Sequence, residues 1–254
     1  MPAPIAPAKE AAAALIARLH ELSDPRNVEG MARFGISAHN TLGVSVTTLR
    51  AIARTTLRKD APPARGQGAD PAERAVWRHE VAVCLWNSEV HEARMLATLL
   101  DDPASVTRDQ ALEWAHGSDS WDLTDGLALN LLNRTPFAYE LPAALAASEH
   151  EFARRAAFAL IAALAWHDKA APDERFVVFL PLIAQHASDP RNFVKKAVSW
   201  ALRHIGKRSV GLYPAALSLA EELAGHEDRA ERWVGRDAVR ELASEKVRQR
   251  LGLA

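Results

Sequence analysis

The spacing of the apolar residues constrains this chain more than any other feature. In nearly every segment of ten or more residues, apolar side chains recur at intervals of three and four, and no segment alternates strictly over the length of a strand. Intervals of three and four place side chains on one face of an α-helix, whereas a half-buried strand requires alternation. The sequence therefore predicts an all-α protein.

Capping residues, prolines and acidic first turns mark the starts of the predicted helices, as in Ser23-Asp24-Pro25, Asp101-Asp102-Pro103 and Ser188-Asp189-Pro190. The predicted helices cover residues 8–22, 25–34, 45–57, 71–87, 90–100, 105–116, 120–134, 136–147, 149–166, 173–187, 190–206, 212–225 and 228–249. We expect residues 1–7 to be flexible. Residues 58–70 are rich in Pro, Gly and charge, which favours an exposed loop insertion, with a functional lid as the alternative.

From about residue 71 the predicted helices form pairs that repeat every 35 to 42 residues or so, the period of stacked helical hairpins. The pentapeptide SDPRN also occurs twice, at residues 23–27 and 188–192. We therefore expect a single domain over residues 1–254, an alpha-alpha superhelix of stacked helix pairs. A compact orthogonal bundle is the alternative architecture.

Composition limits the classes of partner. The chain has 254 residues with a formal net charge of −1, so a polyanionic partner needs a local basic face. No secretory leader pattern and no run of 18 apolar residues is present, which predicts a soluble cytoplasmic protein without a membrane partner. Cys84 lies in an apolar run and is interpreted as buried, with a reactive thiol as the alternative. No His and carboxylate pair has metal-ligand spacing, so no metal is expected.

The segment from Pro190 to Gly206 combines an apolar stripe with a tryptophan outside it. The stripe consists of Phe193, Val194, Ala197, Val198, Ala201, Leu202 and Ile205. Counting by three and four from Trp200 gives Lys196, Arg203, His204 and Lys207. Residues 190–220 hold six Lys or Arg and no Asp or Glu, which predicts an electropositive, locally unpaired face suited to a nucleic-acid backbone. A solvated helix with Trp200 at a packing boundary is the alternative.

Two further segments carry candidate functional residues. Asp122 is explained as a carboxylate in the first turn of a helix, but Asp125 lies four residues after Trp121 and hence on the same face. An indole beside a carboxylate suits a cationic or oxocarbenium-like species. Of the adjacent Arg154 and Arg155, one is expected to point into a groove between repeats, and Arg155 is the candidate. The remaining tryptophans are predicted to lie in the core, namely Trp77, Trp86, Trp114, Trp166 and Trp233.

Taken in order, DSWDLTD, FARRAAFAL and NFVKKAVSWALRHIGK resemble the AlkD family of bacterial alkylpurine DNA glycosylases over about residues 11–249. The family is built from HEAT-like helical repeats, so the resemblance implies a curved solenoid. Its active-site Trp and catalytic Asp look like Trp121 and Asp125, its groove arginine like Arg155, and its second aromatic wall like Trp200. Many members carry a Trp-Trp doublet where this chain has Ser120-Trp121.

The resemblance implies excision of cationic N3- or N7-alkylated purines from double-stranded DNA, without a cofactor, by a monomer in the bacterial cytosol or nucleoid. Asp125 would stabilise positive charge on the deoxyribose, Trp121 and Trp200 would grip the DNA backbone, and Arg155 would hold a phosphate. A non-catalytic protein that recognises damaged or branched DNA, or a protein-interaction solenoid, are the alternatives. The DNA-binding alternative needs only a basic concave face formed by Arg154, Arg155, Lys195, Lys196, Arg203, Lys207 and Arg208.

Overall fold

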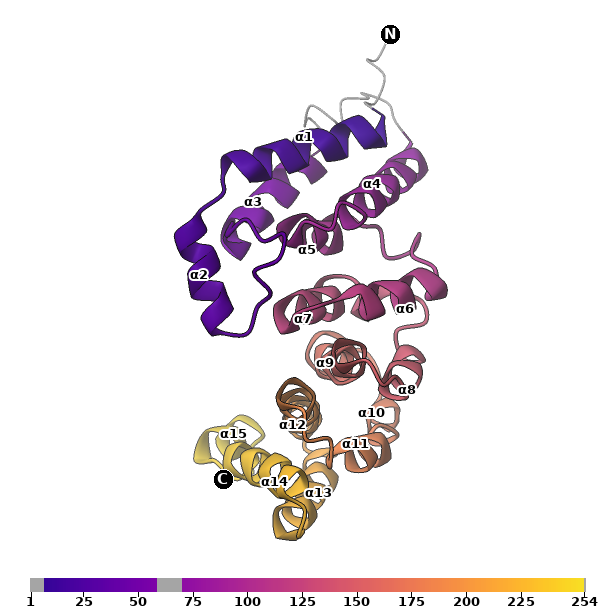
Figure 1. The fold of residues 1–254 in the computed structure, drawn as a ribbon. Coiled ribbons are helices and arrows are strands. Elements are labelled where there is room, and N and C mark those ends of the chain that lie inside the picture. The colour runs from indigo at the N-terminus through magenta and orange to yellow at the C-terminus, as the bar shows by residue number, and fades with distance from the viewer. Residues whose placement is uncertain (1–6, 59–69, 254) are drawn as a thin grey trace. The chain divides into compact units, whose positions relative to one another are not determined.

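The computed structural model describes residues 7–58 and 70–253, and within these ranges all long regular elements are helices (Figure 1). They are α1 (Ala8–Glu21), α2 (Pro25–Arg33), α3 (Val46–Leu57), α4 (Pro71–Trp86), α5 (His91–Leu100), α6 (Arg108–Gly117), α7 (Trp121–Asn130), the 3-10 turn η2 (Leu132–Arg134), α8 (Leu141–Ala146), α9 (Glu151–His167), α10 (Glu174–Val177), α11 (Leu180–His186), α12 (Asn192–Gly206), α13 (Tyr213–Gly225), α14 (Arg229–Leu242) and α15 (Glu245–Arg250). The prediction of an all-α protein is confirmed for these residues. The expected flexible start and most of the expected 58–70 insertion lie outside the described residues.

The chain divides into two compact units, which we describe separately. Unit 1 comprises Met1–Gln110 with Asp119–Pro136, and unit 2 comprises Ala111–Ser118 with Phe137–Ala254. In unit 1, α4 packs on α1 and α5, and α5 packs on α3 and α7 (Figure 1). The core of unit 1 contains fully buried side chains from each of these helices, including Leu19, Ile52, Val81, Leu96 and Leu127. The helix faces predicted from the apolar spacing are therefore the packed faces.

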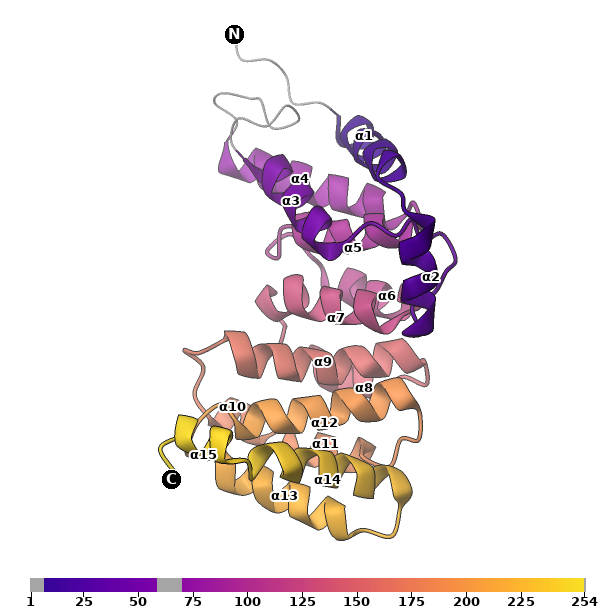
Figure 2. The ribbon, with the colours of Figure 1, turned by 90° about the vertical axis from the view of Figure 1, so that its left-hand side faces the viewer.

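In unit 2, α9 packs against α8 and α12, and α12 packs against α13 and α14. Figure 2 shows α9, α12 and α14 side by side in this unit. The alanines of α9 are buried and let α12 approach closely. In the α13–α14 hairpin, a Cβ on Gly235 would lie 2.1 Å from the backbone nitrogen of Ala224. Only glycine fits at that crossing without displacing the backbone.

Several predicted helix boundaries are wrong. The predicted helix 173–187 is broken into α10 and α11, and the predicted helix 228–249 is broken into α14 and α15, where the Ser244 side chain caps a new helix start. The predicted helices 105–116 and 136–147 begin later, at Arg108 and Leu141. Residues after Asp101 form a turn instead of a helix, because the Asp101 carboxylate is buried and accepts hydrogen bonds from its neighbour's N–H and from Gln110.

The two SDPRN segments share a local turn but not a helix start. Asp24 and Asp189 each accept a hydrogen bond at 3.0 Å from the backbone N–H two residues later. Pro25 is the first residue of α2, whereas Pro190 precedes the start of α12 at Asn192. The second copy therefore positions a carboxylate beside α12 without itself opening the helix.

Burial corrects three predictions made from apolar context. Trp77, Trp86 and Trp114 are buried as predicted, but Trp166 is 52% exposed and Trp233 is 36% exposed. Cys84 is half-buried instead of fully buried. Within the described ranges, no helix has the length and apolar character needed to cross a bilayer. Exposed large aromatic side chains, as on the helices of unit 2, are typical of interaction surfaces.

Candidate functional site

Trp121 and Asp125 lie on α7 of unit 1, one turn apart. Trp121 is the first residue of the helix, after Ser120 in an extended conformation, and both Trp121 and Asp125 are half-buried. Leu123 and Leu127 on the same helix are fully buried and provide its packing. The Trp121 indole Nε1–H donates a hydrogen bond at 3.0 Å to the backbone carbonyl of Phe34, just after α2. The structure thus places the indole and the carboxylate on one face, with the indole held in orientation.

A buried polar pair fixes the start of α7. His91 Nε2 lies 2.9 Å from Asp122 Oδ2, and the Ser120 hydroxyl donates to Asp122 Oδ1 at 2.7 Å. Burial opposes the charged form of both groups, but their hydrogen bond and opposite charges prevail, so the pKa of His91 is raised and the pKa of Asp122 is lowered. Asp122 therefore does more than complement the helix dipole, because it ties α7 to α5.

The neighbouring residue Glu92 anchors a loop of the same unit. Its carboxylate is 1% exposed and accepts hydrogen bonds from the backbone N–H groups of Leu42, Gly43 and Val44 at 2.8, 2.7 and 3.2 Å. Gly43 has a φ of +80°, and a Cβ there would lie 2.2 Å from the Asp24 carbonyl oxygen. This loop supports α2, since the Asp24 N–H donates to the Leu42 carbonyl. The start of α5 thus holds both α7 and the support of α2.

Sequence reasoning did not identify His91 or Glu92. A polar pair at the start of a predicted helix is typical of a first turn, and nothing local indicates partners about 30 and 50 positions away. Two of their partners, Asp122 and the loop of residues 43–44, border a cavity of about 550 Å³ beside Trp121. It is lined by Arg26, Asn27, Gly30, Met31, Phe34, Ile36, Gly43, Val44, Ser45, Val46, Trp121 and Asp122.

Trp200 of unit 2 begins a row of aromatic side chains. It is half-buried and lies outside the buried apolar stripe of α12, as predicted. Its ring centroid is 5.8 Å from that of His204 in an edge-on arrangement, and His204 lies 5.7 Å from exposed Trp166 of α9. Burial, together with the positive charges of Lys207, Arg203 and Lys169, lowers the pKa of His204 to about 3. His204 is therefore neutral at physiological pH.

The prediction of an unpaired basic face on residues 190–220 is wrong. Arg203 lies 3.4 Å from Asp237 and also pairs with Glu241, which pairs in addition with Lys207. Arg208 donates to two backbone carbonyls and its side chain is 4% exposed, with its Nε 3.7 Å from Asp173. The acids come from α14 and from the segment before α10. A charge count within one segment of sequence does not include them.

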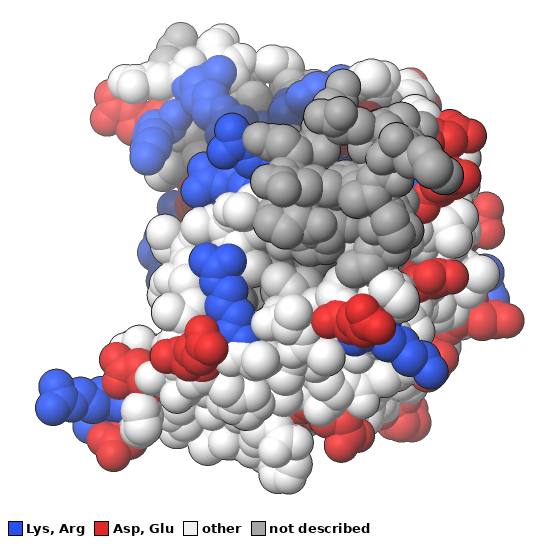
Figure 3. Space-filling view, turned by 90° about the horizontal axis from the view of Figure 1, so that it is seen from above, with Lys and Arg blue, Asp and Glu red and all other residues white. Residues whose placement is uncertain are grey.

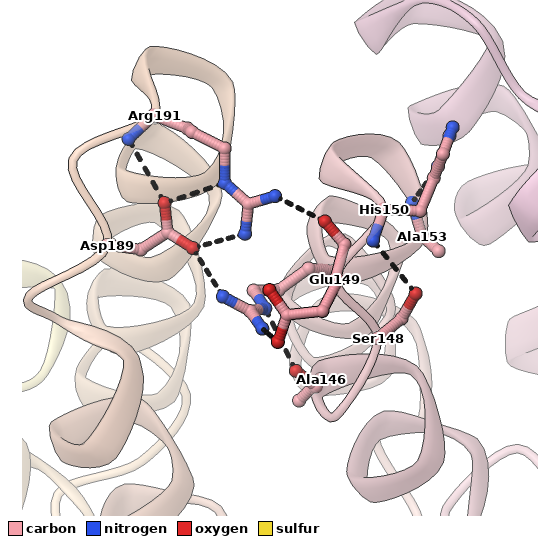
Figure 4. Close-up of polar contacts among 8 residues, drawn as sticks. Ala146, Ser148, Glu149, His150, Ala153, Asp189 and Arg191 are labelled. Atoms are coloured by element: carbon pink, nitrogen blue, oxygen red, sulfur yellow. Dashed lines mark hydrogen bonds and ion pairs between the residues drawn. The ribbon is translucent and has the colours of Figure 1, made fainter.

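Arg154 and Arg155 are both withdrawn from solvent. Figure 4 shows the cluster around Asp189, whose carboxylate binds Arg191. The same carboxylate also pairs with the Arg154 guanidinium at 2.8 Å. Arg154 also donates to the Ala146 carbonyl at 3.0 Å. These two arginines outweigh the effect of burial and lower the pKa of Asp189 to about 2. The cluster therefore joins the starts of α9 and α12.

Arg155 is 6% exposed and donates at 2.6 Å to the backbone carbonyl of Phe193 in α12. Arg155, which was expected to point into a groove between repeats, does lie where α9 meets α12, but its side chain is covered there and does not face solvent. Arg154, Arg155 and Arg208 hold helices together in this structure.

The cations that do reach the surface of unit 2 lie elsewhere. Lys196 is exposed and forms no ion pair with any residue in the described ranges, and Lys195 places its amine 5.1 Å from the centroid of the Trp233 ring. Sequence reasoning missed four arginines on α14, Arg229, Arg232, Arg236 and Arg240. Their spacing of three and four was the available signal.

On the face seen from above in Figure 3, both signs of charge appear, in keeping with the balanced composition.

Among residues 7–58 and 70–253, no group of three or more His, Cys, Asp or Glu side chains could hold a metal ion. Around Trp121, the Glu92 carboxylate accepts hydrogen bonds from backbone N–H groups, and the Asp122 carboxylate contacts His91 and Ser120.

Packed helix pairs in each unit define a helical repeat protein. The model of the DNA alkylation repair enzyme family matches residues 15–242, and the chain belongs to that family. The family resemblance recognised in the sequence is confirmed. A solved structure described as a new family of proteins related to the HEAT-like repeat DNA glycosylases, with affinity for branched DNA structures, matches with a TM-score of 0.69. It shares 17% sequence identity, over 94% of this chain and 95% of that chain, and so establishes the HEAT-like repeat fold. No curated protein matches the chain.

Proposed function

We propose that this protein is a DNA glycosylase that excises cationic N3- or N7-alkylated purines from duplex DNA. The observation that carries the proposal is the placement of Trp121 and Asp125 one turn apart on α7, within a chain of the DNA alkylation repair enzyme family. Both side chains are half-buried, and the hydrogen bonds of His91 and Glu92 fix the position of α7 and of the loop of residues 42–44. Such support keeps reacting groups in a fixed geometry.

The proposed reaction depends on a negatively charged carboxylate, not on an acid that protonates the leaving base. An alkylated purine that already carries positive charge leaves as a neutral base when its bond to the deoxyribose C1′ breaks. The sugar then develops positive charge, which Asp125 stabilises, and a water oxygen adds to C1′ as its proton passes to solvent or to the carboxylate. Trp121, oriented by the Phe34 carbonyl, supplies an aromatic face for the cationic sugar.

In unit 2, Trp200 and the cations of α12 would hold the DNA backbone. Lys195 and Lys196 can bind phosphates without first breaking an ion pair. Arg203 and Lys207 would first exchange the carboxylate of Glu241 for phosphates. Arg154, Arg155 and Arg208 support the helices that carry these groups, and we assign them no phosphate contact.

The test is base release from methylated duplex DNA, measured with enzyme in excess and with the released purines identified by mass. We expect Asp125→Asn to lower the excision rate by a factor of about 100 or more, since the transition state loses a stabilising charge. DNA affinity should stay within about twofold, because backbone contacts dominate it. Asp119→Asn is the matched control, because Asp119 is exposed just before the same helix. Normal excision by Asp125→Asn would contradict the proposed mechanism.

A second candidate is a non-catalytic DNA-binding protein, favoured by the solved relative with affinity for branched DNA structures. In that case neither wild type nor Asp125→Asn releases a base. Salt-sensitive binding, tighter for branched than for linear duplexes, would then remain.

A further inference from the structure

Four arginines form one side of α14. Arg229, Arg232, Arg236 and Arg240 are separated by three, four and four positions, which brings them to one side of the helix. With Trp233 and Asp237 they line a surface hollow of about 350 Å³. We call these four arginines and Trp233 the α14 arginine face. Apart from half-buried Arg232, its members are exposed.

The acids of α14 neutralise other groups more than they neutralise this face. Asp237 accepts a hydrogen bond from the Ser199 hydroxyl at 2.7 Å and pairs with Arg203 of α12. Asp237 also contacts Arg240, but one carboxylate shared between two arginines leaves an excess of positive charge. Glu241 pairs with Arg203 and Lys207, again on α12.

The arginines of the face are left with few anionic partners. The side chains of Arg229 and Arg236 form no hydrogen bond or ion pair with other residues in the described part of the chain. Arg232 donates to the backbone carbonyls of His226 and Glu227 at 3.0 and 2.9 Å, which bind its guanidinium without cancelling its charge. The excess charge on the face is therefore positive and directed to solvent.

Two features distinguish this surface from an ordinary solvated helix. A solvated helix normally alternates charge at spacings of four, whereas Arg232, Arg236 and Arg240 place like charges there and repel one another. Trp233 is 36% exposed within this group, and Lys195 of α12 adds a fifth cation against its ring. A polyanion would relieve the repulsion and cover the indole.

We propose that the α14 arginine face is a DNA-contacting surface of its own, which binds consecutive phosphates of a duplex and packs the Trp233 ring against a sugar. This proposal rests on the proposed function in taking DNA as the ligand. Planar guanidinium groups bind phosphate oxygens in pairs, and an aromatic ring tolerates any sequence. The surface sets affinity and footprint but takes no part in the chemistry at Asp125.

The test uses the full chain with Arg229, Arg236 and Arg240 each changed to Gln. Binding to a fluorescent 25-base-pair duplex is measured across a range of salt concentrations. Each lost phosphate contact should reduce the slope of log affinity against log salt by about 0.9, so we expect a reduction of about 2 to 3 and at least tenfold weaker binding at moderate salt. Trp233→Ala alone should weaken binding about tenfold with little change of slope.

The matched control changes Arg18, Arg50 and Arg54 to Gln. These arginines are exposed on α1 and α3 of unit 1 and give the same change in net charge. A loss of slope specific to the α14 variant, with an unchanged maximal excision rate at saturating enzyme, supports the proposal. An unchanged slope, or an equal loss in the control, overturns it while the glycosylase activity stands.

The experiments also distinguish a failure of the glycosylase proposal from a failure of the proposal for the α14 arginine face. A wild-type protein that binds DNA but releases no base overturns the glycosylase proposal and leaves the α14 arginine face in place. A wild-type protein that binds no DNA overturns both.

Discussion

The two units use charged side chains in opposite ways. In unit 1, Glu92 and His91 are buried, and Glu92 binds backbone N–H groups directly. In unit 2, Asp237 and Glu241 pair with Arg203 and Lys207, and all four side chains remain partly exposed.

The two arrangements differ in how easily another anion can replace the carboxylate. A buried carboxylate that satisfies backbone donors has no competitor, so it fixes a wall in one geometry. A partly exposed ion pair is screened by salt and can exchange its carboxylate for another anion. In the proposed function, the fixed geometry of unit 1 would hold the reacting groups, and the exchangeable ion pairs of unit 2 would bind DNA reversibly.

The largest expected effect tests the buried side of this comparison. Glu92→Gln leaves the three N–H groups of residues 42–44 without a carboxylate, and we expect a loss of about 3 kcal/mol in the free energy of unfolding. Urea denaturation measures it. Glu80→Gln on α4 is the control, because Glu80 is exposed and its loss should be close to zero. Equal stability of the two variants would show that the loop does not depend on Glu92.

A smaller effect compares two carboxylates that share one partner, Arg154. Asp189 is buried and Glu149 is 95% exposed. We expect Asp189→Asn to lower the free energy of unfolding by about 2 kcal/mol, and Glu149→Gln by less than about 0.5 kcal/mol.

The lowered pKa of Asp189 predicts that the stability of the folded protein depends on pH. Because the pKa of folded Asp189 is depressed to about 2, its stabilisation is complete above about pH 4 and is lost as the pH falls toward 2. Melting temperatures between pH 2 and 7 measure this. The Asp189→Asn variant should lose less stability than wild type over that interval, and parallel curves would contradict the assignment.

The smallest expected effect tests whether the ion pairs of Glu241 can be replaced by contacts with DNA phosphates. Glu241→Gln removes the carboxylate that pairs with Arg203 and Lys207, and we expect DNA binding to tighten about three- to tenfold because both cations become available to phosphates. Glu221→Gln, which removes an exposed acid from α13, is the control for net charge. Affinities that match the control would show that Arg203 and Lys207 do not meet the DNA.

Local patterns predicted the helices and part of the site. Apolar spacing separated Trp200 from the stripe that packs α12, and the interval of four placed Trp121 and Asp125 on one face. The same reasoning failed for Trp166 and Trp233, whose apolar neighbours in sequence suggested a core that the packing of α9 and α14 does not provide. Apolar context shows which helix face packs, but not how far a large ring extends beyond the packed face.

The helical class, most helix positions and the family could be predicted from the amino-acid sequence, because these depend on residues within a few turns of one another. Which charged side chains are available to a ligand became clear only from the packing of the helices. The sequence predicted Arg155 and Arg208 as DNA contacts, but neighbouring segments cover both side chains, whereas Arg229, Arg236 and Arg240 of α14 are exposed. The reason is physical: the state of a charge depends on the groups around it in space, and for Arg155 and Arg208 those groups lie about 40 residues away in the chain.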